Sequence, residues 1–475
     1  MTQIFETGAG SVGATKRSRA LVWAARLSVP ALIAGMALVV TPPASAVPSF
    51  ADQTGQPCQA CHVGGFGPEL TPFGREFKLG GYTLRTKASV PLAVAATASL
   101  THTRKDQDPT TLPPGHSAND NLTVDQVNFF VAGGVGQHFG GFVQATYDAV
   151  GNAWGWDDLD LRAVTTGHVL GKDAVFGLTI NNSPTVQDVW NTTPAWGYPF
   201  TTSALAPTPG ASALIDGALA QEVLGFTAYT WIDHQFYAEG GIYTTPAART
   251  LNRLGADPLG GVGDIHGLAP YGRLAWQHEL AGGTAEVGAF AFKADINPLR
   301  DRTSGYTDHY SDVGLDASWQ KTLSSGNTIS SNIRYIHESS NLLASCELGM
   351  VGLGGDPNCA KTTLNEWNAM LGYSWHNKIG ASLGAFSTFG TSNAALYAVN
   401  SGYATTSPNS NGVTGQIDYT PWSAGNSPLG IRANVRLGVQ YTAYGKFNGA
   451  WHNYDGAGAN AADNNTLRFF TWVAF

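Results

Sequence analysis

Charge is scarce in this 475-residue sequence, of which only 13% is Asp, Glu, Lys or Arg. Ordinary soluble domains carry about 25% charged residues, so the composition argues against a typical water-soluble protein. Long hydrophobic runs are also missing. Beyond the N-terminal leader no stretch of about 18 apolar residues occurs, which excludes a membrane protein built of helices. Basic clusters are absent and the formal net charge is −8, which argues against nucleic acid as a partner.

Glycine and aromatic residues are abundant instead, with 58 Gly, 13 Trp, 17 Tyr and 21 Phe. Hydrophobic residues make up 43% of the chain, but they are spread over short alternating segments. This combination is typical of a membrane β-barrel, in which apolar and polar side chains alternate along each strand. The aromatic content and the lack of a glycine period exclude a disordered chain and a collagen-like one.

Residues 1–46 have the three parts of a secretory signal peptide that is removed on export. A basic region (16–26) precedes an apolar stretch (27–40) and the small-residue cleavage site Ala44-Ser45-Ala46. A retained anchor helix is the alternative, but the apolar stretch is short and Pro30 interrupts it. Export predicts an oxidising compartment, in which cysteines pair.

Cys58 and Cys61 are followed directly by His62, in the order Cys58-Gln59-Ala60-Cys61-His62. The C-x-x-C-H spacing is the pattern for covalent attachment of haem c, because two thiols can add to the vinyl groups while the adjacent imidazole reaches the iron. A chance match and a thioredoxin-like redox pair are the alternatives, but the latter needs a βαβ context that this neighbourhood lacks. The sequence therefore predicts one covalently attached haem c, with Cys58, Cys61 and His62 as its binding residues.

The other two cysteines, Cys346 and Cys359, flank a glycine-rich stretch. We expect a structural disulfide between them that closes a loop, a constraint that contributes about 3 kcal/mol by restricting the unfolded chain. A metal site is less favoured there, because neither a histidine nor a third cysteine lies nearby.

The haem segment, residues 47–88, is too small to stand alone, because chains below about 40 residues rarely bury a core unaided. Within it, Thr71 is the expected N-cap of a helix that starts at Pro72 and ends at Gly80-Gly81. Two aromatic residues and two cations on this helix are candidates to pack on the porphyrin and to bind its propionates, namely Phe73 and Phe77, and Arg75 and Lys78. Ordinary packing and solvated charge are the alternatives.

Residues 89–475 divide into sixteen short segments of alternating polarity, an even number within the bacterial outer-membrane range. In one of them, Val313, Leu315 and Trp319 share one parity while Asp312 and Asp316 share the other. The segments lie near 89–104, 123–135, 140–150, 158–168, 173–182, 215–230, 235–245, 270–280, 284–295, 310–322, 327–338, 365–375, 379–390, 412–421, 430–446 and 465–475. A soluble sandwich also alternates in this way.

Two further features favour an outer-membrane barrel. Short and long connections alternate along the chain, as in barrels with periplasmic turns and extracellular loops, and the chain ends on an aromatic residue, Phe475. The predicted fold is therefore all-β: a transmembrane antiparallel barrel of about 16 strands that is surrounded by outer-membrane lipid. We expect its lumen to be plugged by the small helical and loop-rich haem segment, with both termini on the periplasmic side and the loop between Cys346 and Cys359 outside.

The sequence resembles the fused cytochrome–porins of iron-oxidising bacteria. The resemblance covers the mature chain and is carried by the following stretches: Val47–Ala51 leading into Cys58–His62, Leu70–Arg75, Phe77–Leu79, Asn181–Trp190, Trp196–Pro199 and Asn464–Leu467. It implies an outer-membrane conduit that takes electrons from extracellular Fe(II) and passes them to a periplasmic cytochrome or copper protein. The sequence departs from the family pattern in Gly64-Gly65-Phe66-Gly67, which follows the haem histidine.

The sequence leaves two other functions open, a diffusion porin with a haem plug and a haem enzyme with an open sixth coordination site. No catalytic residue is predicted, so the chain counts as an enzyme only if iron oxidation is counted as its reaction. Residues 47–88 contain no second histidine and no methionine, so the sixth iron ligand is expected from the barrel. Among the histidines near short turns (His138, His168, His234, His278 and His376) we rank His168 first, because its strand parity points inward. Met370 also has inward parity.

Overall fold

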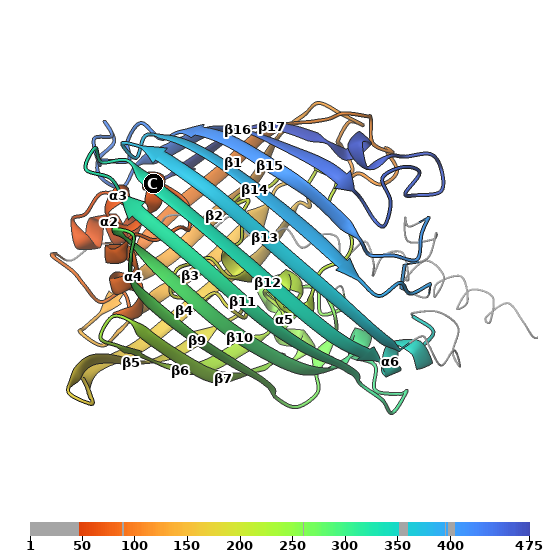
Figure 1. Ribbon diagram of the computed structural model, residues 1–475, viewed down its shortest axis with the longest axis horizontal. Coiled ribbons are helices and arrows are strands. Elements are labelled where there is room, and N and C mark those ends of the chain that lie inside the picture. Colours follow the sequence, from red (N-terminus) through yellow and green to blue (C-terminus); the bar gives the residue numbers. More distant parts are fainter. Residues whose placement is uncertain (1–46, 88–89, 260, 351–359, 395, 398–403) are drawn as a thin grey trace, which may run out of the picture.

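The computed structural model describes residues 47–475, except 88–89, 260, 351–359, 395 and 398–403. Sixteen long antiparallel strands form a closed barrel (Figure 1). They are β1 (Leu92–Thr103), β2 (Asn121–Val135), β3 (Phe139–Asp148), β4 (Ala153–Val169), β5 (Lys172–Asn181), β6 (Leu224–Ile232), β7 (Phe236–Thr244), β9 (Ala269–Leu280), β10 (Gly283–Asn297), β11 (Asp308–Thr322), β12 (Thr328–Leu342), β13 (Lys361–Trp375), β14 (Ile379–Gly390), β15 (Ser410–Tyr419), β16 (Asn434–Lys446) and β17 (Thr466–Ala474).

Each long strand pairs with its neighbours in sequence, and the barrel closes where β1 pairs with β17, for example at Ala95 and Ala474. A two-residue strand, β8 (Asp264–Ile265), adds a short pairing to β10. Closure leaves no open sheet edge, which is the condition for strands to cross lipid. The predicted all-β barrel with sixteen strands is confirmed.

The outer wall of the barrel is apolar. Side chains such as Leu122, Leu178, Leu274 and Ile417 are each more than 60% exposed on it, while their strand neighbours point into the lumen. Soluble monomers rarely expose contiguous apolar patches larger than a few hundred Å², whereas a barrel surrounded by lipid must. This is the architecture of a bacterial outer-membrane β-barrel. No helix in the described part of the chain is long and apolar enough to cross a membrane.

The lumen side of the wall carries the charges that the strand parity places inward. Arg162, Arg273 and Arg468 are 2% exposed or less, and each is paired with a buried carboxylate. Arg432 lies outside this network, because it precedes β16 and its guanidinium donates to the carbonyl oxygen of Leu92. The barrel interior is therefore a network of paired charges.

Residues 47–87 form a group of short helices at the barrel end that also holds the C-terminus (Figure 1). We call this group the plug. It contains α2 (Pro48–Thr54), α3 (Cys58–Cys61), the 3-10 turn η1 (Val63–Gly65) and α4 (Pro72–Leu79). The expected N-cap is confirmed, since the Thr71 hydroxyl accepts a hydrogen bond from the backbone N–H of Gly74.

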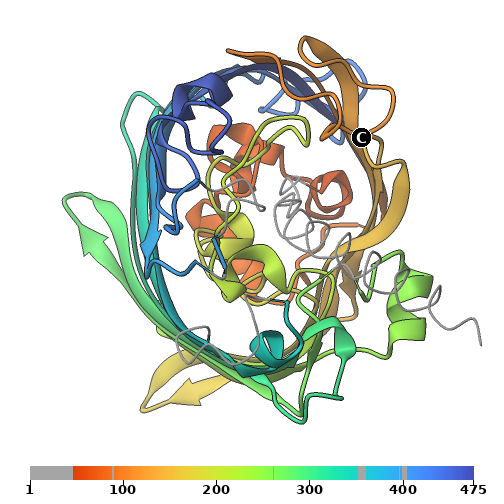
Figure 2. The ribbon, with the colours of Figure 1, turned by 90° about the vertical axis from the view of Figure 1, so that its right-hand side faces the viewer.

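The connection between β5 and β6, residues 182–223, also enters the barrel. Figure 2, which looks into the barrel from the other end, shows the plug and this connection inside the ring of strands. We call residues 182–223 the inward loop. It contains η2 (Pro194–Trp196) and η3 (Leu214–Ala218). The other helical elements among the described residues lie at strand connections: α5 (Ala248–Leu254), η4 (Pro298–Arg300), α6 (Leu343–Glu347) and η6 (Ala461–Asn464).

One predicted strand begins later than expected. The segment 215–230 was predicted as a strand, but β6 starts only at Leu224. The apolar residues Leu214 and Ile215 are instead buried within the lumen, and their backbone N–H groups donate to Glu338 and Asp312 of the barrel wall. Carboxylates on the barrel wall therefore replace the strand partner that these amides would otherwise need.

Candidate functional site

A single helical turn, α3, presents the two cysteines of the C-x-x-C-H motif. Pro57 precedes the turn, and the backbone N–H of His62 closes it by donating to the carbonyl of Cys58 at 2.9 Å. Residues three apart on a helix share a face, so Cys58 and Cys61 point to the same side. Neither thiol is engaged in a disulfide.

The turn is held tightly against α4. A Cβ at Gly74 would come within 2.2 Å of the carbonyl oxygen of Cys61, so only glycine allows this approach of the two helices. The backbone N–H of Thr71 donates to the same Cys61 carbonyl at 2.9 Å, and Val63 donates to Glu69 at 2.9 Å. These contacts fix the motif and α4 in one unit.

The glycine-rich stretch Gly64–Gly67 lies against the barrel wall. The side chain of Asn434 donates to the carbonyl of Gly65 at 2.8 Å, and Arg436 donates to that of Phe66 at 3.1 Å. The ring of Phe66 meets the Trp472 ring edge-on at 4.8 Å between centroids. Residues 64–67 therefore anchor the motif to β16 and β17.

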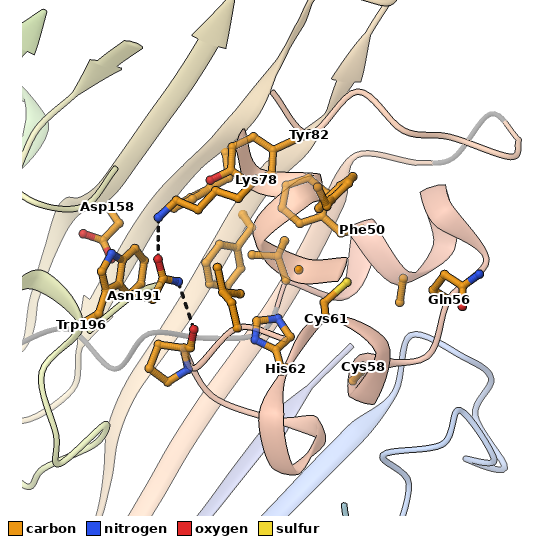
Figure 3. Close-up of a pocket in the computed structure, with 18 of the residues that line it drawn as sticks. Phe50, Gln56, Cys58, Cys61, His62, Lys78, Tyr82, Asp158, Asn191 and Trp196 are labelled. Atoms are coloured by element: carbon orange, nitrogen blue, oxygen red, sulfur yellow. Dashed lines mark hydrogen bonds between the residues drawn. The ribbon is translucent and has the colours of Figure 1, made fainter. Parts of the chain in front are cut away.

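Cys58, Cys61 and His62 line one pocket, which encloses about 790 Å³ of space with its open mouth included (Figure 3). The plug supplies part of the wall, including Phe50, Phe77 and Tyr82. The rest of the wall comes from three barrel strands and from the inward loop, namely Phe130, Phe142, Gln144 and Asp158, and Asn191 and Trp196. The plug therefore does not enclose this space by itself.

Burial dominates the electrostatics of the motif. It raises the pKa of the Cys61 thiol to about 12 and raises that of Cys58 as well, so both thiols are held protonated. Burial lowers the pKa of His62 to about 4, while the backbone of Gly67 acts in the opposite direction. The Nδ1 atom of His62 is buried without a hydrogen-bond partner in the described residues. A buried neutral imidazole beside two thiols is a donor set that suits haem attachment.

The structure brings only some of the predicted helix residues to the pocket. Phe77 and Lys78 line it, whereas Phe73 is half-buried elsewhere. Arg75 also lies away from the pocket, where its guanidinium stacks 3.7 Å from the Trp190 ring centroid and donates to the carbonyl of Leu70 at 2.9 Å. Arg75 is thus a contact between the plug and the inward loop.

The structure does not bring His168 to the pocket. Its side chain is 71% exposed and lies 3.3 Å from Asp173 at a short turn of the barrel. At this end β4 projects beyond the barrel interior, so a side chain with inward parity no longer faces the lumen. His138, His234, His278 and His376 do not line the pocket either, and Met370 is buried on β13 outside it. The sixth ligand that the sequence placed on the barrel has no candidate histidine or methionine in this pocket.

Sequence reasoning assigned no role at the site to the inward loop. The Asn191 side chain donates to the carbonyl of Pro68 at 3.0 Å and accepts from Lys78 at 2.5 Å (Figure 3). Trp196 donates from its indole nitrogen to the carbonyl of Val186 at 2.9 Å. The available signal was the presence of Trp190, Trp196 and Tyr198 in one connection, a density of large aromatics that suits a buried segment better than a solvated loop.

The predicted disulfide is described on one side only. Cys346 is disulfide-bonded and lies on α6, at the barrel end opposite the plug (Figure 1). Cys359, its predicted partner, lies outside the described residues.

No protein-family model and no curated protein matches this sequence. Among solved structures, the in-vitro folded outer-membrane protein OmpT of Vibrio cholerae is similar, with a TM-score of 0.42 and 9% identity over 83% of this chain and 99% of that one. The outer membrane channel DcaP of Acinetobacter baumannii has a TM-score of 0.43 and 13% identity over 83% and 100%. An anion-selective porin from Comamonas acidovorans has a TM-score of 0.42 and 10% identity over 81% and 98%.

Proposed function

We propose that this protein is an outer-membrane electron carrier, in which one haem c is attached to Cys58 and Cys61 and bound through His62 inside the barrel. The observation that carries the proposal is the composition of the pocket wall. The attachment motif, three barrel strands and the inward loop line the same pocket. A segment of about 40 residues cannot bury a core by itself, and here the barrel contributes the missing surface.

Each part of the pocket has a definite task in this proposal. Cys58 and Cys61 would each add a thiol to a vinyl group, and His62 would bind the iron from one side. When bound, haem c supplies a one-electron carrier. The surrounding aromatic side chains exclude water and thereby tune its reduction potential: Phe50, Phe77, Tyr82, Phe130 and Phe142.

We propose extracellular Fe(II) as the electron donor, on the strength of the sequence resemblance. Fe(II) loses one electron and becomes Fe(III), and a periplasmic cytochrome or copper protein gains that electron. No proton relay or nucleophile takes part. The apolar band of such a barrel is about 25 Å tall, so one haem cannot bridge it alone and the acceptor must meet the plug end from the periplasm.

The test uses the mature protein purified in detergent. Adding Fe(II) at acidic and at neutral pH should give the absorption spectrum of reduced haem. The double variant Cys58→Ala/Cys61→Ala, with its barrel still folded, should retain no haem after denaturation. If Fe(II) does not reduce the haem at either pH, Fe(II) is not the electron donor, but the assignment of haem c as the cofactor is unaffected. If the wild-type protein contains no covalent haem, the proposed role as an electron carrier is contradicted.

A diffusion porin is the second candidate, and the closed sixteen-strand barrel favours it, because barrels of this size leave an aqueous channel when nothing fills the lumen. The plug and the inward loop occupy that lumen here (Figure 2). Solute flux through reconstituted protein distinguishes the two functions. Flux comparable with that of an open porin would support the diffusion channel, and tight closure would support the electron carrier. An open sixth position in the haem spectrum would instead favour a haem enzyme.

A further inference from the structure

Lys78 is an unusual lysine, because it is buried at 3% exposure inside the barrel. Its Nζ donates to the carbonyl oxygen of Val186 at 2.7 Å and to Oδ1 of Asn191 at 2.5 Å. Among the described residues no carboxylate lies within 4.0 Å of this nitrogen to form an ion pair. The Lys78 nitrogen also lies 5.1 Å from the centroid of the Trp196 ring. Fully buried lysines are rare and are usually paired with an opposite charge, whereas the partners of Lys78 are two neutral acceptors and an aromatic ring.

We propose that Nζ of Lys78 is the second axial ligand of the haem iron, opposite His62. This inference rests on the proposed attachment of haem c at Cys58 and Cys61. In Figure 3, His62 and Lys78 approach the pocket from different sides, His62 from the end of α3 and Lys78 from α4. Both residues line the pocket that also contains the two thiols.

The number of hydrogen bonds that Lys78 makes equals the number of N–H groups that an amine keeps when it binds a metal. An ammonium carries three N–H donors, and the protein supplies two acceptors, Val186 and Asn191. On binding, Nζ releases its third proton to solvent and its lone pair forms the bond to iron, while the other two N–H groups keep their acceptors. No change of oxidation state is involved.

The other polar side chains of the pocket are committed elsewhere or are weak ligands. The Tyr82 hydroxyl donates to Asp160 at 2.7 Å, and the Gln144 amide donates to Asp157 at 2.7 Å. The Asn191 amide donates to Pro68. Gln56 and Asp158 remain, and an amide or carboxylate oxygen gives a high-spin iron, whereas two nitrogen ligands give a low-spin one. Within the described pocket wall, Lys78 is the amine that can complete a six-coordinate, low-spin site.

Asn191 acts in this arrangement as a positioning residue. It belongs to the inward loop, and it is itself held by its hydrogen bond to Pro68 of the plug. The loop therefore sets the direction of the Lys78 amine, which links the placement of residues 182–223 to the state of the iron.

The experiment compares haem-loaded full-length variants by electron paramagnetic resonance and near-infrared magnetic circular dichroism of the oxidised protein. Wild-type protein should show a low-spin iron with one imidazole and one amine ligand. Lys78→Arg keeps the charge but removes the ligand, and it should lose most of the low-spin signal while retaining covalent haem. Lys78→Met should restore a low-spin iron with the charge-transfer band of a sulfur ligand. The matched control is Lys87→Arg, on the exposed Lys87 that pairs with Asp52, which should leave the spectrum unchanged.

The outcomes separate this inference from the proposed function. A high-spin wild type, or a low-spin signal that survives in Lys78→Arg, overturns the ligand assignment while the covalent haem stays. If the variants fail to fold, the wild-type near-infrared spectrum alone decides, because amine, imidazole and thioether ligands differ there. Absence of covalent haem from the wild type would contradict the proposed function first.

Discussion

Tyr82 of the plug donates its hydroxyl hydrogen to the carboxylate of Asp160 on strand β4, at 2.7 Å. The same carboxylate binds Arg162 at 2.9 Å, and all three side chains are buried. The Tyr82 ring stacks on Phe50 at 5.1 Å between centroids. Its backbone φ of 58° lies in the left-handed region that large side chains rarely adopt, so the surroundings hold Tyr82 in place. This contact joins the pocket-lining side of the plug to the barrel wall.

Replacing Tyr82 with phenylalanine should loosen the plug without opening the barrel. Tyr82→Phe removes one hydrogen bond to a buried carboxylate that Arg162 still neutralises, so we expect a loss of about 1–2 kcal/mol in the free energy of unfolding. Denaturant unfolding and protease cleavage within residues 47–87 measure the effect. Tyr306→Phe, at an exposed loop tyrosine, is the control. A plug that stays as protected as in wild type would contradict the prediction.

Gly74→Ala should disrupt the proposed haem-attachment site through the direct contact between α4 and α3. The added Cβ would sit 2.2 Å from the Cys61 carbonyl oxygen, so α3 and α4 must separate, at a cost of about 1–3 kcal/mol typical of overpacking. We expect a clear drop in covalently bound haem per barrel, read from a haem stain after denaturing electrophoresis. Gly415→Ala on β15, where a Cβ meets no atom within 4 Å, should leave haem content unchanged. Equal covalent haem content per barrel in both variants would show that the α3–α4 contact is not needed for haem attachment.

Acidic pH should stabilise the base of the inward loop through Glu222. Burial raises the pKa of this carboxyl to about 7 from 4.5, opposed in part by Arg300. The folded protein then holds a proton that the unfolded chain has already lost, so this contribution is present below pH 4.5 and disappears as the pH rises through about 7. Glu222→Gln should therefore raise the thermal midpoint more at about pH 8 than at about pH 4.

The size of that effect is on the order of 1 kcal/mol, because the side chain is partly exposed and solvent screens it. Glu347→Gln, at an exposed carboxylate of α6, is the matched control and should show no such difference between the two pH values. A Glu222→Gln variant whose midpoint shifts equally at both pH values would show that protonation of this carboxyl does not contribute.

The strands could be predicted because lipid on one side and the polar lumen on the other make apolar and polar side chains alternate along each strand. Lipid selects apolar side chains outside, such as Val313 and Leu315, and the lumen network selects charged ones inside, such as Asp312 and Asp316. The same rule failed where a connection is buried. Leu214 and Ile215 look like strand residues, but they are apolar because they pack within the lumen.

The C-x-x-C-H motif could be identified from the sequence for a different reason, since its five residues, 58–62, are adjacent in the chain. The rest of the site depends on contacts between distant segments. Asn191 contacts Pro68, which is 123 positions away in the sequence, and nothing about an asparagine or a proline indicates that the two are in contact. His168 shows another limit of prediction from sequence. Strand parity gives the direction of a side chain, but it does not say how far the strand projects beyond the barrel interior.

Asp188 anchors the inward loop, and its removal should open the lumen. Its carboxylate lies 2.9 Å from Nε of Arg273 on β9 and accepts from the backbone N–H of Thr192 at 3.0 Å. Glu286 and Asp316 still neutralise Arg273 in Asp188→Asn, so the loss in the free energy of unfolding should stay at about 1–2 kcal/mol and the barrel should fold.

A less firmly held inward loop in Asp188→Asn leaves more water in the lumen, which predicts a higher single-channel conductance in planar bilayers than that of the wild type. It should also broaden the haem spectrum, because Asn191 and Trp196 belong to the same loop. Asp108→Asn, at an exposed loop carboxylate, should change neither quantity, and an Asp188→Asn conductance equal to wild type would show that other contacts hold the loop.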